Sequence, residues 1–156
     1  MSAPTSVLIR PLQRAVYDYL RDDVPDLSPV RKYIFSRFEK NISTEIKTAL
    51  ETIGITIQVF APRIAKIRPN ANGLLADDGI ELRVRISEHP LTNKTEYEVG
   101  ILQELLLYHL HLWTPPGDIA TTLHAAEDPV DELPHQELNI MDLFFQCSGG
   151  FSVRSA

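Results

Sequence analysis

The clearest pattern in the chain is the strict alternation of apolar and polar residues across Ile80–Ser87. A period of two predicts a β-strand with one face buried and the other face in water. The side chains expected on the wet face are Glu81, Arg83, Arg85 and Ser87. We therefore expect a sheet that presents a charged surface to something outside the domain.

Two helices are predicted before this strand. Apolar residues recur at helical spacing from Val7 to Asp22, with Pro11 in the first turn, where proline is tolerated. The second helix should begin near Ser43, a good N-cap, and end at Gly54 in a left-handed C-cap. Between them, Val30–Phe38 fits either a strand or a helix, and its alternation slightly favours a strand.

A strand follows the second helix, and a long connection follows the strand. Ile55–Phe60 should point Ile55, Ile57 and Val59 inward. The connection from 61 to 79 is rich in proline, asparagine and glycine, and structureless connections of this length are uncommon in compact domains. It is either a functional loop whose basic residues extend the charged face, or a flexible β-hairpin arm with ordinary solubilising charges.

The last third of the chain should add one long helix and two strands. A stripe of apolar residues ending at Trp113 predicts the helix, and it consists of Val99, Leu102, Leu106, Leu110 and Trp113. Strands are predicted at Ile119–Leu123 and Leu138–Cys147, the second ending at Gly149-Gly150. Its inward residues would be Met141, Leu143, Phe145 and Cys147. The acidic segment Glu127–Pro134 between them is predicted to be a loop.

These elements predict a single α+β domain over residues 1–156. Residues 1–40 would hold the first helix and the ambiguous segment, and residues 41–150 the core of sheet and helix. No apolar run approaches the roughly 20 residues that a membrane span needs. The N-terminus has no basic segment followed by an apolar one, and the single Cys147 fits a reducing compartment. We therefore expect a cytoplasmic protein without a membrane partner.

The net charge of −6 is distributed unevenly along the chain. Residues 95–156 contain ten acidic residues and one basic residue, Arg154, whereas residues 1–94 contain fourteen basic and eleven acidic residues. This asymmetry suits head-to-tail contacts between copies, although a simple solvated acidic surface would look the same. The acidic pI of about 5.3 argues against specific nucleic-acid binding.

Candidate catalytic and metal-binding residues are weak. His109 and His111 lie in a helical pattern, where residues two apart diverge by about 200°, so they should not share a metal ion. Cys147 lies in an apolar strand pattern and reads as a buried structural residue. The acidic segment lacks the spacing of a calcium loop. The sequence thus predicts no catalytic, cofactor-binding or metal-binding residues, and the protein is not expected to be an enzyme.

The order of segments across roughly residues 40–150 gives a family resemblance. The segments are Ala49–Gly54, Ile55–Pro62, Pro69–Gly73, Glu81–Pro90, Leu91–Lys94 and His109–Pro116. In this order they resemble the tail-terminator or tail-completion proteins of tailed bacteriophages and prophages. The resemblance implies a small, mainly antiparallel sheet with helices packed on one face.

The resemblance also implies a structural role in virion assembly. The chain would form a homo-oligomeric ring that caps or completes the tail tube, and it would contact tail-tube or head–tail connector proteins. It would be found in the bacterial host cytoplasm and then in the virion or a tail-like particle, with no cofactor. The residues expected on the protein-interaction surface are Arg63, Lys66, Arg68, Arg83 and Arg85.

Two other functions remain open from the sequence. One is a bacterial protein-interaction adaptor or an immunity-type module. The other is a small metal enzyme that depends on His109, His111 or His124.

Overall fold

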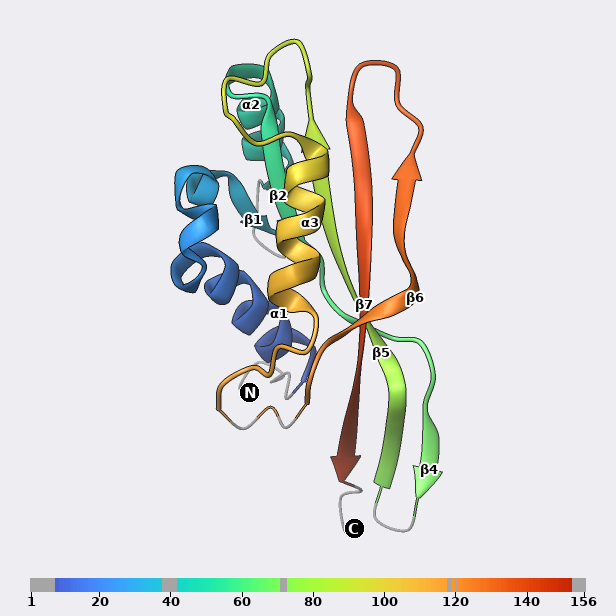
Figure 1. Cartoon of the computed structure of the whole chain (residues 1–156). Coiled ribbons are helices and arrows are strands. Elements are labelled where there is room, and N and C mark those ends of the chain that lie inside the picture. The colour runs from blue at the N-terminus through green and yellow to red at the C-terminus, as the bar shows by residue number, and fades with distance from the viewer. Residues whose placement is uncertain (1–7, 38–41, 71–72, 118, 120, 153–156) are drawn as a thin grey trace, which may run out of the picture.

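The computed structural model describes residues 8–37, 42–70, 73–117, 119 and 121–152. Within them, a seven-stranded mixed sheet has the order β1-β2-β5-β7-β6, and β3 and β4 pair with β5 further along its length. Helices α1 and α3 lie on one side of this sheet (Figure 1). The predicted α+β class is confirmed.

Strands β5 (Gly73–Glu88) and β7 (Asn139–Ser152) form the centre of the sheet. They pair antiparallel from Gly73 opposite Ser152 to Glu88 opposite Asn139, with an irregularity between Ala76 and Ile80. Apart from Met141, which is only half-buried, the inward side chains are fully buried, as the alternating pattern predicts. They are Ile80, Leu82, Val84 and Ile86 on β5 and Leu143, Phe145 and Cys147 on β7.

Strand β2 (Ile55–Val59) pairs antiparallel with β5, and the three-residue β1 (Ile34–Ser36) pairs parallel with β2. Between them, α2 (Ile42–Thr52) contacts both strands. Gly54 ends this helix with φ of +89°, and a side chain there would collide with the backbone of Asn93. The predicted left-handed C-cap is therefore correct.

The N-terminal helix is shorter than predicted because its geometry changes along the chain. Helix α1 (Ile9–Asp18) continues into a π-helical turn (Tyr19–Asp23) and then a 3₁₀ segment (Pro25–Tyr33). The strand predicted over Val30–Phe38 is thus limited to β1. Residues 30–33 belong to the 3₁₀ segment instead, in which Leu27 and Val30 are both buried.

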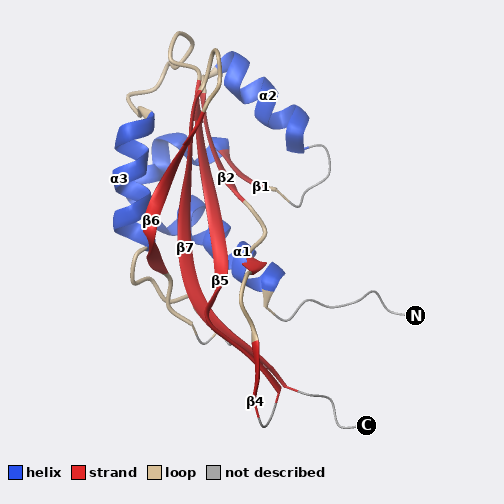
Figure 2. Cartoon of the chain, turned by 90° about the vertical axis from the view of Figure 1, so that its right-hand side faces the viewer, coloured by secondary structure: helices blue, strands red, loops and turns tan. Residues whose placement is uncertain are grey.

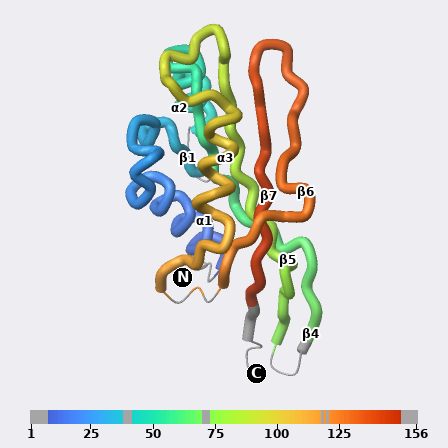
Figure 3. Tube along the Cα trace, in the orientation of Figure 1, coloured from blue at the N-terminus to red at the C-terminus, as the bar shows by residue number. Residues whose placement is uncertain are grey.

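Of the two interpretations of residues 61–79, a functional loop or a β-hairpin arm, the structure agrees with the arm. This region contains β3 (Arg63–Ile64), β4 (Arg68–Asn70) and the first part of β5. β4, β5 and the end of β7 extend as an arm away from the helices (Figure 3). The hairpin-arm interpretation therefore describes the backbone better. Gly79 is required where the arm begins, because a Cβ there would collide with the Lys66 carbonyl oxygen.

The predicted acidic loop is wrong, because residues 127–133 belong to the edge strand β6 (His124–Leu133). An edge strand has one ladder partner and tolerates proline, and Pro129 lies in the register shift between Ala125 and Val130. The strand predicted at 119–123 is absent from its described residues, and residue 120 lies outside the described part. Nor does β7 end at Gly149, where a Cβ would meet the Ile80 side chain.

Helix α3 (Val99–Leu110) supplies the largest helical contribution to the core. Leu102, Leu106 and Leu110 are fully buried, and Val99 and Trp113 pack against the core at its margin. The predicted apolar stripe is confirmed as far as Leu110, where the helix ends, and Trp113 packs against the core from the segment that follows. None of the described helices is both long and apolar enough to cross a membrane.

Substitution of Leu106 by aspartate should unfold the domain. Leu106 is 0% exposed, and an unpaired buried carboxylate should cost more than about 4 kcal/mol of unfolding free energy. Tyr108→Asp is the matched control, because Tyr108 is 79% exposed on the same helix and should change stability by less than about 1 kcal/mol. Urea denaturation followed by circular dichroism measures both values. A Leu106→Asp protein as stable as the control would contradict the assigned orientation of α3.

Candidate functional site

The structure divides the five basic residues predicted to form one surface. Arg63, Arg83 and Arg85 lie close to Phe60 or to its neighbours on the sheet. Lys66 and Arg68 instead line a separate small hollow on the arm, where two nitrogens of Arg68 donate to the same Asp77 oxygen at 2.6 and 3.0 Å. The charged surface does not run continuously through all five.

The sheet face that points away from α1 and α3 is the one toward the viewer in Figure 2. Several arginines and two phenylalanines lie close together on the strands of this sheet, on the side opposite the buried residues of β5. Arg83 lies between two phenylalanines, since it pairs with Phe144 on β7 and its carbonyl accepts a hydrogen bond from the Phe60 amide. We call this surface the arginine face. It consists of Arg37, Arg63, Arg83, Arg85, Phe60 and Phe144.

Phe60 organises three of the four arginines through cation–π contacts. The guanidinium carbons of Arg83, Arg85 and Arg37 lie 3.9, 5.1 and 5.4 Å from the centre of its ring. Guanidinium groups within about 6 Å of a ring face are attracted to its electrons. Phe60 therefore holds positive charges together that would otherwise repel one another.

The buried carboxylate of Asp142 holds two of these arginines, Arg83 and Arg85, in place. Arg85 binds Asp142 with both oxygens, at 2.7 and 3.0 Å, and Arg83 lies 3.5 Å from the same carboxylate. Asp142 is only 2% exposed, whereas the Arg85 side chain is 25% and the Arg83 side chain 37% exposed. A bidentate arginine–carboxylate pair is strong and geometrically rigid, so the two side chains are positioned before any ligand arrives.

The arginine face encloses a hollow of about 500 Å³ with a positive formal charge. Its lining residues are Arg37, Phe60, Ala61, Arg63, Glu81, Arg83 and Phe144. Four arginines of the face against Glu81 and Asp142 leave a formal charge of +2. Since Glu81 pairs with Arg63 at 3.4 Å, the least compensated cation is Arg37, which donates to the Ser43 hydroxyl.

The opposite charge lies on the edge strand at the other border of the sheet. Strand β6 carries four carboxylates and no lysine or arginine. All four residues are exposed, and we call them the acidic strand: Glu127, Asp128, Asp131 and Glu132. Within the described residues, β6 pairs with β7 alone, so its outer backbone edge has no strand partner.

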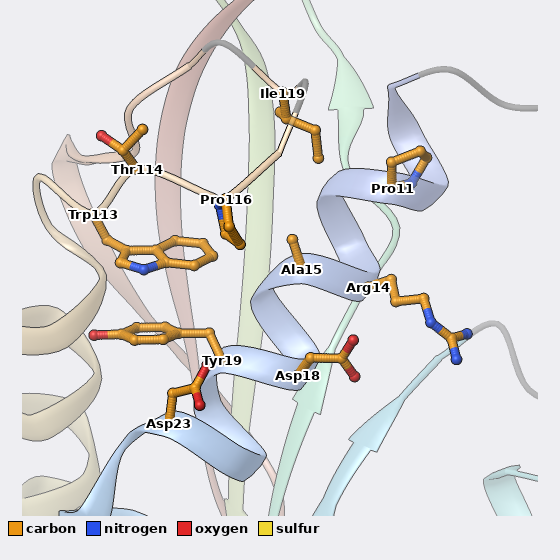
Figure 4. A pocket seen from close by; sticks show the side chains of 10 residues that line it. All are labelled: Pro11, Arg14, Ala15, Asp18, Tyr19, Asp23, Trp113, Thr114, Pro116 and Ile119. Atoms are coloured by element: carbon orange, nitrogen blue, oxygen red, sulfur yellow. The ribbon is translucent and has the colours of Figure 1, made fainter.

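A second hollow of about 550 Å³ lies on the helix side of the sheet (Figure 4). Tyr19 and Trp113 stack there with ring centres 4.4 Å apart, and Pro116 lies beyond the indole. Burial, reinforced by the charge of Asp23, raises the pKa of the Tyr19 hydroxyl. The hollow is lined by both positive and negative side chains, namely those of Arg14, Asp18 and Asp23. This mixed lining does not indicate a preference for cations or for anions.

The histidines considered as metal ligands point to different partners. His109 Nε2 lies 3.0 Å from Asp26, while His111 Nδ1 accepts a hydrogen bond from the Ala125 amide at 2.9 Å. His124 lies 3.4 Å from Asp78. No group of three or more potential metal ligands converges among the residues the structure describes.

Comparison with protein-family models and with curated protein sequences finds no match.

Sequence patterns could have revealed part of the arginine face that was missed. Phe144 occupies an outward position of β7, and Phe60 continues the outward alternation just after β2. Apolar aromatic residues at outward positions are a signal of a surface that binds something. Arg37 and Asp142 gave no such signal, because they reach this surface only through β1–β2 pairing and the register that sets Arg85 opposite Asp142.

Arg85 should matter for stability far more than Arg63. Arg85→Ala removes the two short hydrogen bonds to the buried Asp142 carboxylate and leaves it only the longer 3.5 Å contact with Arg83, which should cost about 2–3 kcal/mol of unfolding free energy. Arg63→Ala removes an exposed pair with Glu81 and should cost less than about 0.5 kcal/mol. Chemical denaturation of both variants measures the difference.

Adding Asp142→Asn to Arg85→Ala should recover part of the loss, since the uncompensated charge is then removed. Equal stability of Arg85→Ala and Arg63→Ala would contradict the clamping role of Asp142.

Cys147 should be unreactive in the folded protein. The residue is fully buried, and burial raises the pKa of its thiol despite the hydrogen bond from Thr121, so little thiolate forms at neutral pH. Titration with a thiol reagent should show modification only after denaturant is added. Rapid modification of the native protein would contradict this placement.

Proposed function

We propose that this chain is a non-enzymatic assembly subunit of a phage or prophage tail. Copies would join head to tail into a ring that caps or completes the tail tube, and the ring would present a surface to tube or connector proteins. The observation that carries the proposal is the separation of charge across one sheet, with arginines on the face that points away from α1 and α3 and carboxylates along the edge strand β6.

Head-to-tail assembly requires two different surfaces on each subunit that fit one another. A contact made by one surface with itself yields a closed dimer, whereas a contact between two different surfaces yields a ring or a filament. The arginine face and the acidic strand are such a pair of surfaces.

A structural role also agrees with how the polar groups are used. His109 and His111, which were considered as metal ligands, each make a hydrogen bond within the domain, and Cys147 is buried. The arginines, by contrast, are held at the surface by Phe60 and Asp142. Rigid, partly exposed arginines are typical of protein interfaces, where arginine is enriched.

Light scattering over a concentration series, with negative-stain images of the largest species, tests the proposal. We expect a discrete ring whose mass stops increasing with concentration, or a monomer that forms rings at the ends of tail tubes from the same phage or prophage. Filaments that keep lengthening would contradict a capping role. A chain that stays monomeric both alone and with tubes would instead favour an adaptor or immunity-type module.

A further inference from the structure

We infer that the acidic strand of one copy binds the arginine face of a second copy. This inference rests on the proposed assembly function and names the two surfaces that meet. Each copy would offer the carboxylates of Glu127, Asp128, Asp131 and Glu132 to the hollow around Phe60 in its neighbour.

The arginine face has cations that are free to turn toward a carboxylate from another chain. Arg63 is 72% exposed, and its partner Glu81 lies at 3.4 Å, a long contact that contributes little in water. Arg37 lies over Phe60 and donates to the Ser43 hydroxyl at 3.3 Å. Neither side chain is tied to a buried carboxylate, so both can pair across an interface without loss of an internal ion pair.

The acidic strand is accessible in the way such a contact requires. Its four carboxylate residues are exposed, and the outer edge of β6 faces no other described strand. An exposed strand edge offers unpaired backbone N–H and C=O groups to a neighbouring chain. Backbone groups and carboxylates on one strand could therefore both contribute to the contact.

No ion pair joins the two surfaces within one chain, among the residues that the structure describes. In the sheet order, β7 separates β6 from β5, and β2 and β3 lie beyond β5. Neighbouring strands are about 4.8 Å apart, so the acidic strand lies roughly 10 Å or more from the nearest arginine strand. The charges on both surfaces remain available to a second copy.

Electrostatics favours the unlike contact over both like contacts. Two acidic strands placed edge to edge would bring eight carboxylates together, and two arginine faces would also repel each other. Only the contact between an arginine face and an acidic strand brings opposite charges together. Such a contact is heterologous, which is the symmetry that a ring needs.

Another exposed surface competes for the role but has weaker support. On α3, Ile101 and Tyr108 are exposed, and Leu112 lies just beyond the helix end. This stripe is apolar, and nothing else in the structure indicates what would cover it. It therefore serves as the alternative interface in the experiment.

A charge-swap experiment tests the contact. The first variant, Arg37→Glu/Arg63→Glu, reverses the charges of the two arginines that do not contact Asp142. The ion pairs of Arg83 and Arg85 with Asp142 are left intact. The second, Glu127→Lys/Asp128→Lys, reverses two adjacent carboxylates of β6. Light scattering at low ionic strength, about 0.05 M, should show each variant self-associating at least about tenfold more weakly than the wild type.

An equal mixture of the two variants should regain the wild-type association, because each mutated surface then finds a complementary one. Matched controls are Arg14→Glu/Lys94→Glu and Glu96→Lys/Glu104→Lys. They reverse the same number of exposed charges away from both surfaces and should assemble like the wild type. Thermal unfolding of all four variants confirms that they are folded.

Three results would overturn the contact. They are swapped variants that associate like the wild type, a mixture that stays dissociated, and a wild type that remains monomeric up to about 1 mM at low salt both alone and with tail tubes. If rings form and resist the swaps, the contact fails while the assembly function stands. If the swaps act as expected but the particles never bind tail tubes, the contact stands and the tail function fails.

Discussion

The pairing of β5 with β7 is the constraint on which the rest of the structure depends. Its register fixes which side chains of both strands point toward the helices and which point away. Ile80, Leu82, Val84 and Ile86 fill the core, and the residues between them necessarily form the opposite face. A slip of one residue would place Arg83 and Arg85 in the core, so the surface chemistry is inseparable from the fold.

The same register explains why the arginine face is rigid. It places Arg85 opposite Asp142 and Arg83 opposite Phe144, while β2 brings Phe60 to the other side of Arg83. A long side chain loses conformational entropy when it binds a partner, and arginines that are already ordered lose less. Asp142 and Phe60 thus act on binding indirectly, by holding Arg83 and Arg85 in place, whereas Arg37 and Arg63 remain more adjustable at the rim.

Local patterns in the sequence were sufficient for the elements that bury one face. The alternation in Ile80–Ser87, the helical stripe ending at Trp113 and the glycine cap at Gly54 each predicted a feature that the structure confirms. The acidic stretch around Pro129 was misread as a loop, because the edge position that tolerates proline and charge depends on tertiary pairing. The sequence did not place Arg37 and Asp142 on the arginine face either, because they reach it only through pairing between segments that are distant in the chain.

Hydrogen–deuterium exchange at low and high protein concentration would locate the contact between copies. Our account predicts that amides of residues 127–133 and of residues 60–64 become more protected as the chain associates, while those of α3 do not change. Added salt should reverse this protection, because the contact is between opposite charges. Concentration-dependent protection confined to α3, with no change in β6 or around Phe60, would contradict the account and assign the interface to the apolar stripe.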